Sequence, residues 1–144
     1  MQTSLVVCRP DESLVTVAQR MHVRRVGACL VLDGPALAGI FTERDLLRLV
    51  AGGADVTGLA VSAAMTVDVA VAPFDADLTW AAETMRRLGV RHLPVAGEAG
   101  QVTGMVSLRD LYAAAEAVLR LDPRGADVAR EMLTAAGGPA AGTD

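Results

Sequence analysis

The sequence contains no lysine and no asparagine, and only 3% of its 144 residues are aromatic. All 13 basic residues are therefore arginine, a bias more typical of genomic base composition than of a particular function. With so few aromatic rings, Val, Leu and Ala must fill the core, and a stacking platform for single-stranded nucleic acid is missing. The absence of lysine also excludes a P-loop nucleotide site, which needs that residue.

Excess positive charge and clustered metal ligands are missing as well. The formal net charge is −4, which does not favour nucleic acid or an anionic membrane as a partner. The two histidines, His22 and His92, and the two cysteines, Cys8 and Cys29, show neither CxxC nor HxxxH spacing, so no metal site is predicted. Both cysteines lie in apolar, strand-like runs, and we expect them to be buried free thiols in a reducing compartment.

Long apolar runs are absent, because Asp33 and Asp68 interrupt the best candidates before they reach membrane-spanning length. The N-terminal region lacks the basic stretch, apolar run and cleavage site of a signal peptide. We therefore expect a cytoplasmic protein that has no membrane partner.

Groups arranged for catalysis are equally hard to find. An enzyme needs a nucleophile, or an acid and a base, each with a partner. The sequence has no Gly-x-Ser-x-Gly elbow and no His, Asp and Ser at a supporting spacing. Glu43 and Leu108 occupy equivalent places in two otherwise similar segments, which argues against a catalytic pair of carboxylates. We expect a protein that is not an enzyme.

What the sequence does contain is an internal repeat. The octet "GIFTERDL" at residues 39–46 returns as "GMVSLRDL" at residues 104–111. Upstream, "DESLVTVAQRM" at residues 11–21 aligns with "DADLTWAAETM" at residues 75–85. In both segments apolar residues recur at i, i+3, i+4 and i+7, which predicts an amphipathic helix in each. The apolar positions are Leu14, Val17, Ala18 and Met21 in the first segment, and Leu78, Ala81, Ala82 and Met85 in the second; the predicted N-caps are Ser13 and Asp77.

Two apolar strands and a second helix follow each of these helices. The strands are predicted at residues 26–32 and 37–41, then at 90–96 and 102–106, with the second helices beginning at Thr42 and Ser107. A short strand starting at Leu5 or Val69 precedes each half. The fold class is therefore α/β (α+β), with two tandem β-α-β-β-α repeats. Because one half alone buries too little core, we expect the repeats to pack together with pseudo-two-fold symmetry.

The chain is predicted to have four parts. Residues 1–55 form the first repeat, 56–68 the linker and lead-in, 69–120 the second repeat, and 121–144 an additional C-terminal helix with a flexible tail. The Asp122-Pro123 pair should end the last helix of the second repeat, and the further helix is predicted within residues 125–136.

The repeated octet suits two roles that are compatible with each other. As a capping box, its hydroxyl and carboxylate would satisfy free amides at a helix start. As a ligand site, the helix N-terminus, the hydroxyl and the neighbouring arginine would bind a phosphate, and the carboxylate would accept hydrogen bonds from both hydroxyls of a ribose. The residues are Thr42, Arg44 and Asp45 in the first repeat, and Ser107, Arg109 and Asp110 in the second.

These features resemble a tandem CBS-domain pair, also called a Bateman module. The resemblance covers residues 4–115 and rests on the two octets, on "VRHLPV" at residues 90–95 and on "AAMT" at residues 63–66. It implies a regulatory module that binds an adenosine-containing ligand, such as AMP, ADP, ATP or S-adenosylmethionine, in a cleft between the repeats. It implies no separate cofactor, and it leaves open whether Mg²⁺ accompanies the phosphates of the ligand.

The resemblance assigns the hydroxyl and the carboxylate of each octet to phosphate and ribose. It also places the residues ahead of each central strand in the cleft; these are Arg25, Gly27 and Ala28 in the first repeat, and Arg91 and His92 in the second. The weaker candidates for contacts with adenine are Val7, Cys8, Val71 and Pro94. Two alternatives stay open: the arginines are solvated charges at the rim, and His92 is a strand-end histidine that touches no ligand.

The two halves differ where the ligand is expected. The second has Arg91 and His92 where the first has Gly27 and Ala28. A phosphate-rich ligand should favour whichever cleft receives Arg91 and His92, so we expect one tight site and one weak or empty site.

The favoured interpretation is a stand-alone sensor. Its ligand would change the packing of the repeats, and a second copy in a dimer or a separate effector protein would respond to that change. CBS pairs commonly form homodimers through their helices, and the predicted interface comprises Leu46, Leu47, Leu111 and residues 113–117. The alternative is an interaction scaffold of the same fold that binds no ligand. Nucleic acid, which has been linked to some family members, is not an expected partner.

Overall fold

A computed structural model describes residues 5–121, 124–125, 127 and 130–131. Its order of elements is β1 (Val7–Cys8), α1 (Leu14–Arg24), β2 (Ala28–Asp33), β3 (Ala36–Thr42), α2 (Glu43–Ala51), a 3-10 turn η1 (Val61–Ala63), α3 (Leu78–Leu88), β4 (His92–Ala96), β5 (Val102–Ser107) and α4 (Leu108–Leu121). The chain divides into two compact units, Met1–Leu108 and Arg109–Asp144. The first unit holds both sheets, and nearly all of α4 belongs to the second.

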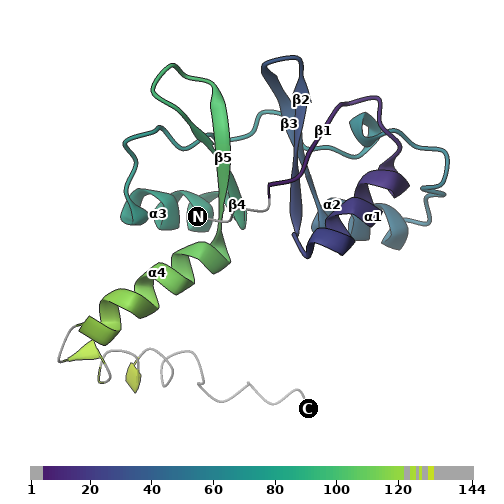
Figure 1. The fold of residues 1–144 in the computed structure, drawn as a ribbon. Helices are drawn as coiled ribbons and strands as arrows, with labels where there is room; N and C mark the ends of the chain where they lie inside the picture. Colours follow the sequence, from purple (N-terminus) through teal and green to yellow (C-terminus); the bar gives the residue numbers. More distant parts are fainter. Residues whose placement is uncertain (1–4, 122–123, 126, 128–129, 132–144) are drawn as a thin grey trace, which may run out of the picture. The chain divides into compact units, whose positions relative to one another are not determined.

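The first repeat is a three-stranded sheet in the order β1-β2-β3, with α1 and α2 on the same side of it (Figure 1). β1 runs parallel to β2, and β3 returns antiparallel, which places Thr42 opposite Ala28. The predicted apolar face of α1 is confirmed, because Leu14, Val17 and Met21 are buried against the strands. Phe41 is also fully buried, so this repeat has a continuous core without needing many aromatic rings.

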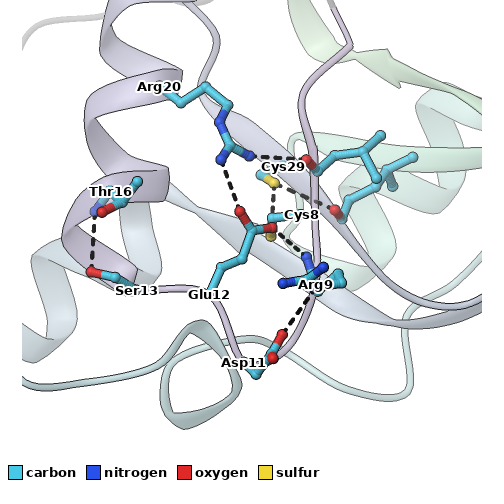
Figure 2. Close-up of polar contacts among 10 residues, drawn as sticks. Cys8, Arg9, Asp11, Glu12, Ser13, Thr16, Arg20 and Cys29 are labelled. Atoms are coloured by element: carbon cyan, nitrogen blue, oxygen red, sulfur yellow. Dashed lines mark hydrogen bonds and ion pairs between the residues drawn. The ribbon is translucent and has the colours of Figure 1, made fainter.

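Polar contacts hold the short strand β1 beside α1. The Arg20 guanidinium donates to the Val7 carbonyl oxygen at 3.1 Å and to Glu12 at 2.8 Å (Figure 2). The Arg9 backbone N–H donates to the other oxygen of Glu12 at 2.6 Å. The predicted cap of α1 is confirmed, since Ser13 accepts from the Thr16 N–H. These contacts connect the two-residue strand to a regular helix, which compensates for its few ladder hydrogen bonds.

The second repeat has an antiparallel pair, β4 and β5, and the helix α3, which begins at its predicted cap Asp77. The strand predicted from Val69 is not formed. A single bridge joins Ala72 to Val95, with the Ala72 N–H donating to the Pro94 carbonyl oxygen at 2.8 Å. Pro73 follows and has no N–H, so it cannot extend a ladder of hydrogen bonds.

The buried face of α3 also differs from the prediction. Ala81 and Met85 are buried as expected, but Leu78 is 49% exposed and Ala82 is exposed, whereas Thr84 is buried. The stripe that faces the core is thus rotated toward Ala81, Thr84 and Met85, which still follow helical spacing. The helical period of 3.6 residues was predicted correctly, but it could not decide which of the neighbouring residues on that side of α3 are buried against the strands.

The linker packs against the first repeat. Val61 is fully buried in the first core, with Leu59, Ala64 and Met65 packed around it. Thr66 then pairs antiparallel with Ile40 of β3 through two backbone hydrogen bonds, of 2.8 and 3.0 Å. A Cβ at Gly39 would lie 2.5 Å from the Thr66 carbonyl oxygen, so this crossing explains the glycine that opens the first octet.

The C-terminal predictions fall largely on residues that the structure leaves undescribed. The helix expected within residues 125–136 and the flexible tail after it lie mostly outside the described residues. In the part of the chain that is described, no helix combines the length and the apolar character needed to cross a membrane.

Candidate functional site

A cavity of about 370 Å³ lies between the first repeat, the linker and the second repeat, entirely within the first unit. The first repeat contributes the start of α2 and the adjoining strand residues. The linker contributes its last residues, and the second repeat contributes the end of α3 and the start of β4. The lining residues are Gly27, Ile40, Thr42, Glu43, Arg44, Asp45 and Arg48, then Thr66, Asp68, Val69 and Ala70, and finally Leu88, Gly89, Val90, Arg91, His92 and Leu93.

Thr42 and Asp45 form the predicted capping box at the start of α2. The Asp45 N–H donates to Thr42 Oγ1 at 3.2 Å, and the Thr42 N–H donates to Asp45 Oδ2 at 2.9 Å. The Thr42 hydroxyl also lies 3.0 Å from Asp45 Oδ2 and donates to it. Asp45 is 4% exposed, so the carboxylate is buried where the helix N-terminus favours negative charge.

The other oxygen of Asp45 has two partners that the sequence did not predict. Thr66 Oγ1 donates to Asp45 Oδ1 at 3.1 Å, and Arg48 Nη1 donates to the same oxygen at 3.3 Å. Arg48 is one turn beyond Asp45 on α2, a spacing that could have suggested the contact. Thr66 ends the "AAMT" segment, and only the crossing of the linker over β3 brings it to the carboxylate.

Arg44 connects the two repeats. Its Nη1 donates to the Gly89 carbonyl oxygen at 3.0 Å, where Gly89 ends α3 in the left-handed conformation. A guanidinium at this position complements the partial negative charge of a helix C-terminus. Arg44 therefore lines the cavity, and at least one of its donors holds the second repeat to the first.

Gly27 and Arg91 enter the cavity by equivalent backbone geometry. The Glu43 N–H donates to the Gly27 carbonyl oxygen at 3.0 Å, and in the second repeat the Leu108 N–H donates to the Arg91 carbonyl oxygen at 2.8 Å. A Cβ at Gly27 would lie 3.0 Å from Glu43 Oε1 and 3.5 Å from His92 Cε1. The missing side chain of Gly27 thus keeps room between a carboxylate of one repeat and an imidazole of the other.

The remaining predicted residues lie elsewhere in the fold. Arg25 is exposed at the left-handed end of α1, while Ala28 and Pro94 are buried in β2 and β4; none of these three lines the cavity. Ser107 is buried at the end of β5 and pairs with His92 across the hairpin. Arg109 and Asp110 belong to the first turn of α4, in the second unit. Of the adenine candidates, Cys8 is buried in β1 and Val7 exposes 41% of its surface.

Carboxylates also enter the cavity from positions to which the sequence assigned no role. Glu43 and Asp68 both line it, and Asp68 has a positive φ of 56° at the end of the linker. Among the residues that the structure describes, no group of three or more His, Cys, Asp or Glu side chains is arranged to hold a metal ion. Chemically, the cavity combines hydroxyl donors, guanidinium groups and carboxylates with apolar lining residues that include Ile40 and Leu93.

Two segments of the chain match one family model, that of the CBS domain, at residues 1–52 and 61–117. The chain therefore belongs to the CBS-domain family, and the two matches identify it as a tandem CBS pair. The resemblance drawn from the octets, and the α/β fold of two repeats, are confirmed.

The chain is also similar in sequence to curated proteins. An uncharacterized 17.7 kDa protein of Acidianus ambivalens is 34% identical over 110 residues, which are 76% of this chain and 66% of the relative. The chain spans between 53% and 66% of the length of three curated relatives that it matches.

Solved structures agree with the fold. A CBS-domain-containing protein from Agrobacterium tumefaciens is 36% identical with a TM-score of 0.71, and the match covers 76% of this chain and 83% of that one. A CBS-domain protein from Pyrobaculum aerophilum, whose structure is a complex with AMP, is 26% identical with a TM-score of 0.69 and coverage of 76% and 85%.

Proposed function

We propose that this protein is a regulatory module that binds an adenosine-containing ligand in the cavity between its two CBS repeats. The candidate ligands are AMP, ADP, ATP and S-adenosylmethionine. The single observation that carries the proposal is the composition of the cavity wall. It joins the hydroxyl and carboxylate of the first octet to Arg91 and His92 of the second repeat. The AMP complex of the Pyrobaculum aerophilum protein supports the ligand class.

The polar groups of the cavity suit the parts of a nucleoside phosphate. The partial positive charge at the N-terminus of α2, together with the Arg91 guanidinium, would attract the phosphate. Asp45 would accept hydrogen bonds from the ribose hydroxyls, and the apolar side chains of Ile40 and Leu93 would pack against the base. Any Mg²⁺ at the site would enter with the phosphates of the ligand.

The proposed role is regulatory and not catalytic. Because the cavity is built from both repeats and from the linker, a ligand that fits one arrangement of these parts better than another would bias the protein toward that arrangement. The bias equals the difference in binding free energy between the two arrangements. A separate effector protein or a second copy of the chain would respond to it.

We also propose that the module works as a homodimer through its helices. On α2, Leu47 is 66% exposed and Val50 is exposed, whereas Leu46 packs against the first core and cannot serve an interface there. On α4, the exposed apolar residues include Tyr112 and Val118. Multi-angle light scattering checks this proposal, and a monomer at micromolar concentration would contradict it.

Isothermal titration with AMP, ADP, ATP and S-adenosylmethionine tests the proposed function. We expect at least one of the four to bind, and Asp45→Ala to weaken it by more than tenfold, because the ribose hydroxyls lose a charged acceptor. Circular dichroism must show that the variant remains folded, since Asp45 also caps α2. Loss of binding together with loss of fold would not count as support, and in that case Asp45→Asn, which keeps the shape of the side chain, replaces it.

One observation favours a second candidate, an interaction scaffold of the same fold that binds no ligand. All of the hydrogen-bond partners of Asp45 described above are supplied by the protein itself, so the signature can act as a helix cap alone. Absence of heat with all four ligands, from a folded protein, would favour this alternative.

A further inference from the structure

Asp45 is saturated with donors in the structure. A carboxylate offers about four acceptor positions. The Thr42 N–H and hydroxyl occupy Oδ2, while the Thr66 hydroxyl and the Arg48 guanidinium occupy Oδ1. A ribose that is to bind Asp45 must therefore displace at least one donor.

The two oxygens differ in how easily they can be released. The Thr42 donors belong to the capping box, so freeing Oδ2 would leave the start of α2 without its cap. The donors on Oδ1 come from the linker and from the next turn of the helix. Arg48 makes the longest of the four contacts, at 3.3 Å, and its side chain is 69% exposed. It is the donor that can leave at the lowest cost, because water can solvate its exposed guanidinium while the Thr42 and Thr66 donors stay on Asp45.

Arg48 can also reach the ligand after it leaves, because it lines the same cavity. Its side chain places the guanidinium beside the Asp45 carboxylate and has enough rotatable bonds to turn it toward an anion inside the cavity. A guanidinium binds phosphate through two parallel hydrogen bonds, which are stronger than its one long contact with Asp45. Arg44 is less free to do this, since it donates to Gly89 across the repeats.

We propose that Arg48 exchanges partners when a nucleoside phosphate binds, leaving Asp45 for the phosphate while a ribose hydroxyl takes its place on Oδ1. This makes Arg48 a specificity-determining residue, selecting adenosine ligands that carry a phosphate over those that do not. A ligand without phosphate also displaces Arg48 from Asp45 but offers it no anion in return. The inference rests on the proposed function and assigns the ligand class of the same site.

Titration calorimetry with AMP and adenosine tests the exchange in the 144-residue chain. The wild type should bind AMP at least tenfold more tightly than adenosine. Arg48→Met should weaken AMP about tenfold, the usual effect of losing a charge-assisted hydrogen bond, and leave adenosine unchanged or slightly tighter. Arg48→Lys should recover part of the affinity for AMP, because it restores the charge but not the paired donors. Arg86→Met is the matched control, since it removes the same charge from an exposed position on α3 outside the cavity.

The outcomes separate this inference from the proposed function. If the wild type binds AMP and Arg48→Met keeps the same ratio of AMP to adenosine affinity, the exchange is wrong and the function stands. An equal loss in Arg86→Met would also overturn it, by showing a general effect of charge. Binding of S-adenosylmethionine without binding of AMP would overturn the exchange, because S-adenosylmethionine carries no phosphate, and it would leave the proposed function in place. Absence of binding by all adenosine ligands would overturn the function and the exchange together.

Discussion

The two CBS repeats share a backbone pattern but contribute different chemistry to one cavity. In both, an amide at the start of the second helix donates to the residue that precedes the central strand. In the first repeat that residue is Gly27, which leaves space, and in the second it is Arg91, which adds charge. The first repeat also has three strands and a continuous core, whereas the second has two strands and one isolated bridge. A repeat in sequence can thus produce complementary halves of one site instead of two equal sites.

The largest expected effect concerns the linker crossing, which involves the first octet. Gly39→Ala should lower the free energy of unfolding by about 2–3 kcal/mol, because its new methyl group would overlap the Thr66 carbonyl oxygen that pairs with β3. Urea denaturation measures the change. Gly58→Ala is the control, since a Cβ there would have no neighbour within 4 Å, and it should change stability by less than about 0.5 kcal/mol. Similar losses in the two variants would show that the crossing is not tight.

The next effect compares the two octets directly. Asp45→Asn should weaken AMP binding about tenfold, while Asp110→Asn should weaken it less than about threefold, because Asp45 lines the cavity, whereas Asp110 belongs to the second unit. Calorimetry of both variants against the wild type provides the measurement. Equal losses, or two sites of equal affinity in the wild type, would contradict the unequal occupancy that we predict.

A smaller effect concerns β1, the strand that has no counterpart among the described residues of the second repeat, and its contact with β2. Cys29 of β2 donates a hydrogen bond to Cys8 of β1, with 3.2 Å between the sulfur atoms (Figure 2). That hydrogen bond raises the pKa of the Cys29 thiol, and burial raises it further. The same hydrogen bond lowers the pKa of Cys8, against the opposing effect of burial. The folded state holds the Cys29 proton more tightly than the unfolded state does. Cys29 therefore makes its full contribution to the free energy of unfolding below the pKa of the unfolded thiol, about 8.5, and this contribution declines as the pH rises above that value. Cys8 has the opposite sign and acts at lower pH.

The free energy of unfolding should therefore fall between pH 8.5 and 9.5, by up to about 1.4 kcal/mol per pH unit. Denaturation in reducing buffer measures it, and the lack of lysine removes the most common side chains that would titrate just above this range. Cys29→Ala should flatten the slope even though it lowers stability at every pH. A slope that persists unchanged in this variant would assign it to another group.

Local features of the fold could be predicted from the sequence, and contacts through space could not. The caps at Ser13, Thr42 and Asp77 were predictable because each depends on residues within one helical turn. The contact of Arg48 with Asp45 lies within one turn of α2, so its spacing could have suggested it. The contact of Thr66 with Asp45 depends on a linker that crosses β3, which no periodicity encodes. The short apolar segment from Val69 predicted a strand ahead of the second repeat, but the following Pro73 leaves a single bridge at Ala72.

The burial of Val61 in the first core has a consequence for dissecting the molecule. A fragment cut at residue 55 would keep every strand and helix of the first repeat, yet it would lose the side chain that closes its core and the partner of Ile40 along β3. A fragment of the first repeat must therefore extend at least through Thr66 to keep these contacts. The segment at residues 56–66, which the sequence predicts to be a linker, therefore packs as part of the first repeat.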